Sequence, residues 1–300
     1  MSIDATHASG GLAGDRAVEL IITPRTRPVG NGQVRRLLPF AKRRMVGPFI
    51  FADLIGPDVL EPGGGVDIDA HPHIGLATVT YLFAGTLVHR DSTGAVQRIE
   101  PGAVNWMSAG RGVCHTERSP DDERSARRVL AGLQTWVALP ASHEDADPFF
   151  QHVDAVDVQS ASGDGVTVRL AAGSGFGLTS PVRVVSPLIL AELLLSGGSI
   201  IVPADHAERA VLLVDGHVAL NGNDIEPGHL VVLADGSTPV LSGRGRVMML
   251  GGESVGARHI WWNFVSSDRE RIETAKIDWA AQRFPLVPGD HTHPVPAPSN

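Results

Sequence analysis

Short runs of β-branched and aromatic residues alternate with turn residues along nearly the whole chain. In the first half the runs cover 77–83, 87–90, 96–99 and 104–107, and Gly85, Gly94 and Gly102 stand in the turns. In the second half they cover 166–170, 188–195, 200–202, 211–214, 217–220, 230–233 and 247–250. Strands at intervals of about 8–12 residues indicate an antiparallel sandwich or barrel. The sequence therefore predicts an all-β protein.

A weak internal repeat divides the chain into two units. The segment Ile99-Glu100-Pro101-Gly102 recurs as Ile225-Glu226-Pro227-Gly228, and an apolar run follows each copy. Upstream of the two copies, Gly85 aligns with Gly216. We therefore expect two related β-barrel domains, packed together, over residues 1–150 and 151–300. Asp215-Gly216 is typical of a two-residue hairpin turn.

One segment predicts a helix, near the C-terminus. Ser267 followed by Glu270 fits a capping box, with the serine at the N-cap. Ile272, Ala275 and Trp279 then fall on one helical face.

Composition excludes several classes of protein. No run of about 18 apolar residues occurs, so we expect no membrane span. The single cysteine, Cys114, excludes an internal disulfide and a site with several cysteine ligands. A net charge of −8 argues against direct binding of nucleic acid. The first residues do not resemble a secretion signal, and we expect a cytoplasmic protein.

Two pairs of metal-binding residue types share the same spacing. His71 and His73 are two residues apart, as are His115 and Glu117, and residues i and i+2 of a strand face one side. In a barrel such strands can face each other across the lumen. Three imidazoles and one carboxylate suit Fe(II), and less selectively Mn, Ni, Co, Cu or Zn. With 13 histidines in the chain, one such pair can also arise by chance.

The repeat also predicts which domain lacks a metal. Aligned on the repeat, the four candidate ligands correspond to Val202, Ala204, Leu241 and Gly243. None of these side chains can bind a metal, so we expect one metal ion per chain, in the N-terminal domain.

Segments 63–82 and 104–120 resemble the two metal-binding motifs of the pirin family, a branch of the cupin superfamily. Further similar segments extend this resemblance over most of residues 25–290. It implies a bicupin fold with a metal, usually iron, only in the N-terminal barrel. It assigns the ligands to His71, His73, His115 and Glu117.

The chain departs from the family motif at two positions. Many pirins have arginine where this chain has Ile74 and glutamate where it has Ala77. We expect these changes to alter the charge of the pocket.

The resemblance implies two alternative functions. Some pirins are similar in activity to quercetin 2,3-dioxygenases, so one expectation is an oxygenase that takes O₂ and a flavonol or another aromatic hydroxyl compound. In this enzyme Glu117 would be the general base. The alternative is a non-enzymatic, iron-dependent redox sensor that binds a protein partner.

Overall fold

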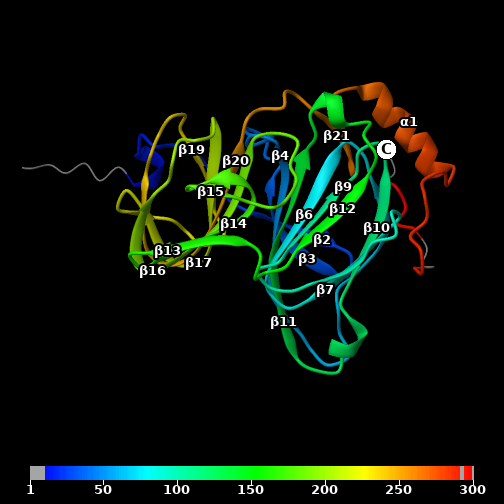
Figure 1. Ribbon diagram of the computed structural model, residues 1–300, viewed down its shortest axis with the longest axis horizontal. Helices are drawn as coiled ribbons and strands as arrows, with labels where there is room; N and C mark the ends of the chain where they lie inside the picture. Colours follow the sequence, from blue (N-terminus) through cyan, green and yellow to red (C-terminus); the bar gives the residue numbers. More distant parts are fainter. Residues whose placement is uncertain (1–10, 291–293, 299–300) are drawn as a thin grey trace, which may run out of the picture.

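The computed structural model describes residues 11–290 and 294–298, and its architecture is antiparallel β with one α-helix. Two cupin domains lie side by side along the long axis (Figure 1). The all-β, two-domain prediction is confirmed. Among the described residues, no helix is both long enough and apolar enough to cross a membrane.

The N-terminal domain consists of two sheets that face each other. The larger sheet has the order β12-β9-β6-β11-β4-β3-β2, and the smaller has the order β5-β10-β7-β8. The strands of the larger sheet are β2 (Arg25–Val29), β3 (Gly32–Leu38), β4 (Phe49–Leu60), β6 (Leu76–Ala84), β9 (Val104–Ser108), β11 (Arg128–Ala138) and β12 (Phe149–Val153). Those of the smaller sheet are β5 (Asp67–His73), β7 (Leu87–Asp91), β8 (Val96–Ile99) and β10 (Val113–Arg118).

The C-terminal domain is one curved sheet with the order β1-β19-β17-β20-β16-β14-β13. Its strands are β1 (Val18–Ile22), β13 (Gln159–Gly163), β14 (Val166–Gly175), β16 (Leu188–Ile201), β17 (Glu208–Leu220), β19 (Leu230–Leu233) and β20 (Val240–Gly252). Two short strands, β15 (Leu178–Thr179) and β18 (Asn223–Asp224), pair with β14 and β17.

Both ends of the described chain cross to the other domain. Strand β1 pairs with β19 of the C-terminal sheet. At the other end, β21 (His259–Trp261), β22 (Phe264–Ser266) and α1 (Arg269–Ala280) pack on the N-terminal domain, where Figure 1 shows α1 in orange. The predicted boundary at residue 150 stays a prediction. Strand β1 precedes this boundary but joins the C-terminal sheet, and β21, β22 and α1 follow it but pack on the N-terminal domain.

A shared hydrophobic cluster joins the domains. Val79 and Leu133 of the N-terminal domain belong to the same buried cluster as Leu190 and Met248 of the C-terminal domain. Within this interface, the buried Tyr81 hydroxyl donates a hydrogen bond of 2.9 Å to Glu192 Oε2.

Equivalent hydrogen bonds support the internal repeat. The Gly102 N–H donates to the Leu82 carbonyl at 2.9 Å, and the Gly228 N–H donates to the Leu213 carbonyl at 2.6 Å. Both glycines have φ near +80°, at 79° and 85°, which favours glycine. The two copies of the Ile-Glu-Pro-Gly segment therefore make the same turn.

The hairpin predicted at Asp215-Gly216 is wrong. Strand β17 runs through both residues and pairs with β20 on either side of an irregularity between Leu213 and Asp215. Gly216 has φ 88°, and a Cβ there would lie 2.4 Å from the Arg244 carbonyl oxygen. The extra residue of the bulge is Val214, just before the dipeptide, and Asp215 and Gly216 pair with Arg246 and Gly245 inside a long strand.

The C-terminal helix forms, but its predicted cap is shifted by one residue. The N-cap is Asp268, whose Oδ1 accepts from the Glu270 N–H at 2.9 Å. The Ser267 hydroxyl instead donates to the buried carboxylate of Glu144 at 3.0 Å. A tertiary contact thus removes Ser267 from the capping position.

Candidate metal centre

The candidate ligands lie on two strands that are direct neighbours. His71 of β5 pairs with His115 of β10 in the antiparallel ladder. Alternation along each strand places His73 beside His71 and Glu117 beside His115. The expectation that the two pairs face each other across the lumen is therefore wrong, because β5 and β10 are adjacent strands of the smaller sheet.

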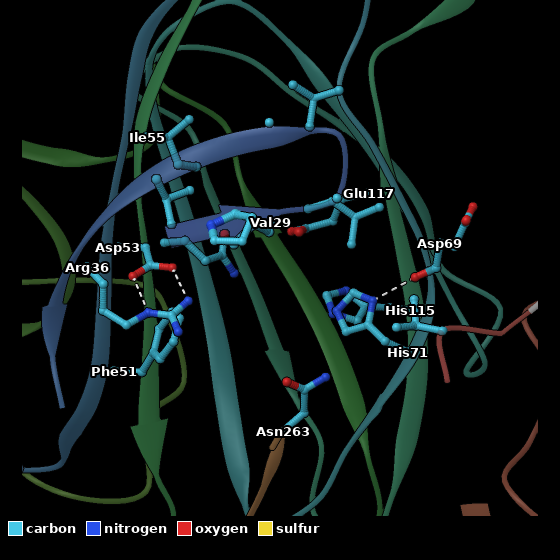
Figure 2. Close-up of a pocket in the computed structure, with 18 of the residues that line it drawn as sticks. Val29, Arg36, Phe51, Asp53, Ile55, Asp69, His71, His115, Glu117 and Asn263 are labelled. Carbon is cyan, nitrogen blue, oxygen red and sulfur yellow. Dashed lines mark hydrogen bonds and ion pairs between the residues drawn. The ribbon is translucent and has the colours of Figure 1, made fainter. Parts of the chain in front are cut away.

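Three imidazoles converge at this position. Ligand nitrogens of His71, His73 and His115 all lie within 4.8 Å of one another, and His73 Nε2 lies 3.1 Å from His115 Nε2. Two nitrogens that bind one ion at a right angle, each at about 2.1 Å, are about 3 Å apart. Figure 2 shows His71 and His115 together on one wall of a cavity. The spacing fits a divalent metal ion.

Burial keeps these imidazoles neutral. It lowers the pKa of His71 to about 4 and that of His73 and His115 well below the ordinary value. The positive charge that each neighbouring histidine would carry adds to this effect on His73 and His115. The His71 Nδ1–H donates to the Asp69 carbonyl oxygen at 2.8 Å, which leaves Nε2 with a free lone pair.

A buried pair, His89 and Asp91, orients His115 through its Nδ1 atom. His115 Nδ1 lies 3.3 Å from His89 Nδ1, and His89 Nε2 lies 3.0 Å from Asp91 Oδ2. Burial acts to raise the pKa of Asp91, but hydrogen bonds from His89 and Thr93 give a net lowering. An ionised Asp91 accepts the His89 Nε2–H, which leaves His89 Nδ1 as the acceptor for the His115 Nδ1–H. His115 Nε2 is then free for a metal.

Glu117 lies on the His89 side of His115. A carboxylate oxygen of Glu117 and ring nitrogens of His89 and His115 all lie within 4.8 Å of one another. His115 therefore belongs both to this cluster and to the cluster of three histidines. Thr80 Oγ1 is 3.2 Å from Glu117 Oε1 and 2.9 Å from Gln134 Oε1, and its single proton can serve one acceptor at a time. Burial raises the pKa of Glu117. The ligand set His71, His73, His115 and Glu117 stays a prediction.

The centre opens into a cavity of about 1000 Å³. This volume is at the upper end of the range for small-molecule sites, about 300–1,000 Å³. Phe51 and Trp136 stack there at 4.0 Å between ring centroids, and the Trp136 ring meets the His73 ring edge-on at 5.1 Å. Arg36 and Asp53 lie on the opposite side of the cavity from the histidines (Figure 2).

The sequence analysis missed these further cavity residues. Arg36 and Asp53 come from β3 and β4, and Ile260, Trp262 and Asn263 reach the cavity from the far end of the chain. No local motif marks them, because strand pairing brings them to the site.

The two positions that depart from the family motif, Ile74 and Ala77, lie outside the cavity. Ile74 is buried in a cluster with Phe264 and Ile272 of the C-terminal segment, and Ala77 is fully buried in the core between the domains. Neither residue lines the cavity. The expected change in pocket charge at these two positions is therefore wrong.

In the C-terminal domain, Val202 and Leu241 are buried in an aliphatic cluster. Gly243 offers no side chain, and Ala204 is exposed. Within residues 11–290 and 294–298, the clustered histidines and acids that could hold a metal all belong to the N-terminal domain. His291 and His293 lie outside the described residues.

Comparison with known proteins gives matches over nearly the whole chain. The Pirin family model matches residues 31–137, and the model of the pirin C-terminal cupin domain matches residues 191–285. A pirin-like protein of Caulobacter vibrioides is 43% identical over 287 residues, which cover 94% of this chain and 99% of the relative.

Solved structures share the fold. A crystal structure of quercetin 2,3-dioxygenase from Acinetobacter baumannii superposes with a TM-score of 0.87 at 32% identity, over 94% of this chain and 95% of that one. A bacterial pirin from Escherichia coli in complex with nickel(II) superposes with a TM-score of 0.61 at 19% identity, over 78% and 99%. The two family models match both halves of the chain, the Caulobacter relative matches it over nearly its full length, and the solved structures share its two-barrel fold. This chain therefore belongs to the pirin family, with an N-terminal pirin domain and a C-terminal pirin cupin domain.

Proposed function

We propose that this chain is a mononuclear metal-dependent oxygenase of the quercetin 2,3-dioxygenase type, acting on aromatic hydroxyl compounds. The observation that carries the proposal is the cluster of three neutral imidazoles, with Glu117 close by, on the wall of a cavity large enough for an aromatic substrate. A relative that is 32% identical bears the quercetin 2,3-dioxygenase name.

The donor set favours a first-row divalent metal, and we propose Fe(II) held by His71, His73, His115 and Glu117. Imidazole also suits Ni, Cu and Zn, so the residues alone do not select iron. When bound, the ion supplies Lewis acidity at the substrate hydroxyl and the redox chemistry that O₂ requires.

Glu117 is the proposed general base. Its carboxylate is buried, and burial raises its pKa toward the range in which a base is effective. It would accept the proton of the substrate hydroxyl on the oxygen that faces the cavity. Thr80 can then turn its hydroxyl between Glu117 and Gln134 as the charge on Glu117 changes.

The aromatic wall positions the substrate. Phe51 and Trp136 stack almost parallel, with 12° between their rings, and Arg36 lies over Phe51 at 4.4 Å. Because Trp136 and Arg36 cover the two faces of Phe51, a planar substrate would contact the edges of this wall while its hydroxyl reaches the histidines. A substrate bound there would displace water from this surface and so strengthen the electrostatic interactions in the site.

The test is anaerobic loading with Fe(II), followed by O₂ consumption with a panel of flavonols and catechols. At equal iron content, Glu117→Gln should lose about 10²–10⁴-fold in turnover, because it removes the base and keeps an oxygen ligand. Glu61→Gln, at an exposed ion pair with Arg127, is the matched control and should behave as the parent. Parent-like turnover by Glu117→Gln would show that the carboxylate is not the base.

The competing function predicts a different result. A redox-sensing interaction protein would consume no O₂ with any compound of the panel, and its affinity for a protein partner would change between Fe(II) and Fe(III). The same Glu117→Gln substitution would then raise the reduction potential, because a neutral ligand stabilises Fe(III) less than an anionic one.

A further inference from the structure

The strongest feature not used by the proposed function is a row of polar residues across the floor of the cavity. Arg36 pairs with Asp53, Asp53 with Gln134, and Gln134 with Thr80 in the ladders of β3, β4, β11 and β6. Directly paired residues of neighbouring strands point to the same face of a sheet. Since Thr80 contacts Glu117, this face is the one that looks into the site.

Arg36 is held rigidly in this row. Its Nε and Nη2 donate to the two oxygens of Asp53 at 2.9 and 2.7 Å, and its guanidinium lies 4.4 Å over the Phe51 ring. These contacts fix the plane of the guanidinium. A guanidinium has five N–H donors, and in the described part of the chain three of them have no protein partner.

Gln134 adds two more donors to the row, on the other side of Asp53 from Arg36. Its Oε1 accepts from Thr80 at 2.9 Å, so its Nε2 is directed away from that contact, and within the described ranges Nε2 has no protein acceptor. Both residues line the cavity, and Arg36 is the sole Lys or Arg among its described lining residues. Three further aspartates line the cavity: Asp67 pairs with Arg124, Asp69 pairs with Arg118, and Asp58 lies near Arg35.

We propose that Arg36 and Gln134 form an oxygen-binding subsite that takes a carboxylate or carbonyl oxygen of the substrate. The inference rests on the proposed function and narrows its substrate class. The substrate would be an aromatic ring with a metal-binding hydroxyl at one end and an acceptor oxygen at the other. Its ring would lie against the edge of the Phe51–Trp136 stack. This places it between the histidines and Arg36, which Figure 2 shows on opposite sides of the cavity.

The experiment measures binding without turnover. The protein is loaded with Zn(II), which is redox-inert, and titrated by calorimetry with catechol, protocatechuate and protocatechualdehyde. These ligands share the chelating hydroxyls and differ in the acceptor oxygen at the far side of the ring. The parent should bind protocatechuate or protocatechualdehyde at least about 10-fold more tightly than catechol, the range of hydrogen bonds to a charged group.

Arg36→Gln should remove that preference and change catechol binding less than about twofold. Arg27→Gln, at an exposed position of neighbouring β2, is the charge-matched control and should keep the preference. Because Arg36→Gln leaves Asp53 buried without its cation, a double variant, Arg36→Met with Asp53→Leu, removes the whole pair and should give the same result. Whether the aldehyde or the acid shows the preference identifies the acceptor as neutral or charged.

Two outcomes overturn the subsite: a parent that does not distinguish the three ligands, or Arg36 variants that weaken all three equally. Failure of the oxygenase is a separate result. If the Zn(II) protein shows the Arg36-dependent preference while the Fe(II) protein consumes no O₂, the subsite stands and the proposed reaction falls. If O₂ is consumed at rates that Arg36 does not affect, with no binding preference, the subsite alone falls.

Discussion

His115 is the residue on which both candidate ligand clusters depend. It shares one cluster with His71 and His73 and the other with His89 and Glu117. Its orientation is set by the contact with His89, which is held in turn by Asp91. Groups that orient a metal ligand from behind commonly change metal affinity by about 10–100-fold when they are removed.

His89→Phe should therefore weaken metal binding by about 10–100-fold. Phenylalanine keeps the stacking on Phe150, where the rings lie 4.6 Å apart, and removes both the acceptor for His115 Nδ1 and the donor to Asp91 Oδ2. Competition with a chelator measures the affinity. His217→Phe, at an exposed histidine of the C-terminal domain, is the control. Unchanged affinity in His89→Phe would mean that packing alone holds His115.

The histidine cluster also makes a prediction about pH. The pKa of His71 is lowered to about 4 in the folded protein, while an unfolded histidine titrates near 6.5. Between these values the unfolded chain binds more protons, so the metal-free protein should lose stability as the pH falls from about 6.5 to about 4.5. Above pH 7 this contribution is complete and constant.

Denaturant unfolding at several pH values measures this slope, and His71→Gln should remove part of it. Glu117 acts in the opposite direction at pH values above its ordinary pKa of 4.5, because its pKa is raised in the folded state, so the slope is measured in a Glu117→Gln background. Equal stability of the Glu117→Gln protein at pH 6.5 and 4.5 would contradict the lowered pKa values of the three imidazoles.

At the scale of strands, a glycine can be required for its positive φ or for the close approach of a neighbouring strand, and Gly216 of β17 allows these two effects to be separated. Gly216 and Gly236 both have positive φ, 88° and 64°, but only Gly216 is crowded by a neighbouring strand. Gly216→Ala should lower the free energy of unfolding by several kcal/mol, since a Cβ would collide with main-chain atoms of β20. Gly236→Ala, with open space around it, should cost about 1 kcal/mol. Equal losses in the two variants would show that φ alone decides.

The strands are also where sequence-based prediction succeeds and fails. Alternation within a strand could be read locally, and it placed His71 with His73 and His115 with Glu117 on common faces. Strand pairing could not be read, because it depends on contacts between distant segments. Two predictions failed because strand pairing could not be read: the hairpin at Asp215-Gly216 and the placement of β5 across the lumen from β10. Arg36, Asp53 and Gln134 were missed for the same reason, since their row exists only across strands.

For the whole molecule, the contact between Tyr81 and Glu192 is a direct probe of domain packing. Tyr81 is the single tyrosine of the chain, so its ultraviolet absorbance reports on this one site. Burial and the charge of Glu192 raise its pKa above the ordinary value of 10.0. In the folded protein its tyrosinate band should be absent where a free tyrosine ionises, and it should appear on unfolding.

Tyr81→Phe should lower the free energy of unfolding by about 1–3 kcal/mol, because a buried carboxylate loses a hydrogen-bond donor. By linkage, the contribution of Tyr81 in the parent is complete below pH 10 and is lost as the pH rises above it. Chemical denaturation at neutral pH measures the loss. A tyrosinate band near pH 10 in the folded parent, where a free tyrosine ionises, would mean that the interface opens in solution.

The exchange of chain ends between the domains has a consequence for synthesis on the ribosome. The candidate ligands are made before Ile260, Trp262 and Asn263, which complete the cavity wall and follow Glu117 by more than 140 residues. The N-terminal sheet also lacks its cover of β22 and α1 until then. A nascent chain therefore carries the histidines long before the pocket around them is closed. We expect stable metal capture to follow the emergence of residues 260–263, so that the order of events is their synthesis, closure of the wall, and then loading.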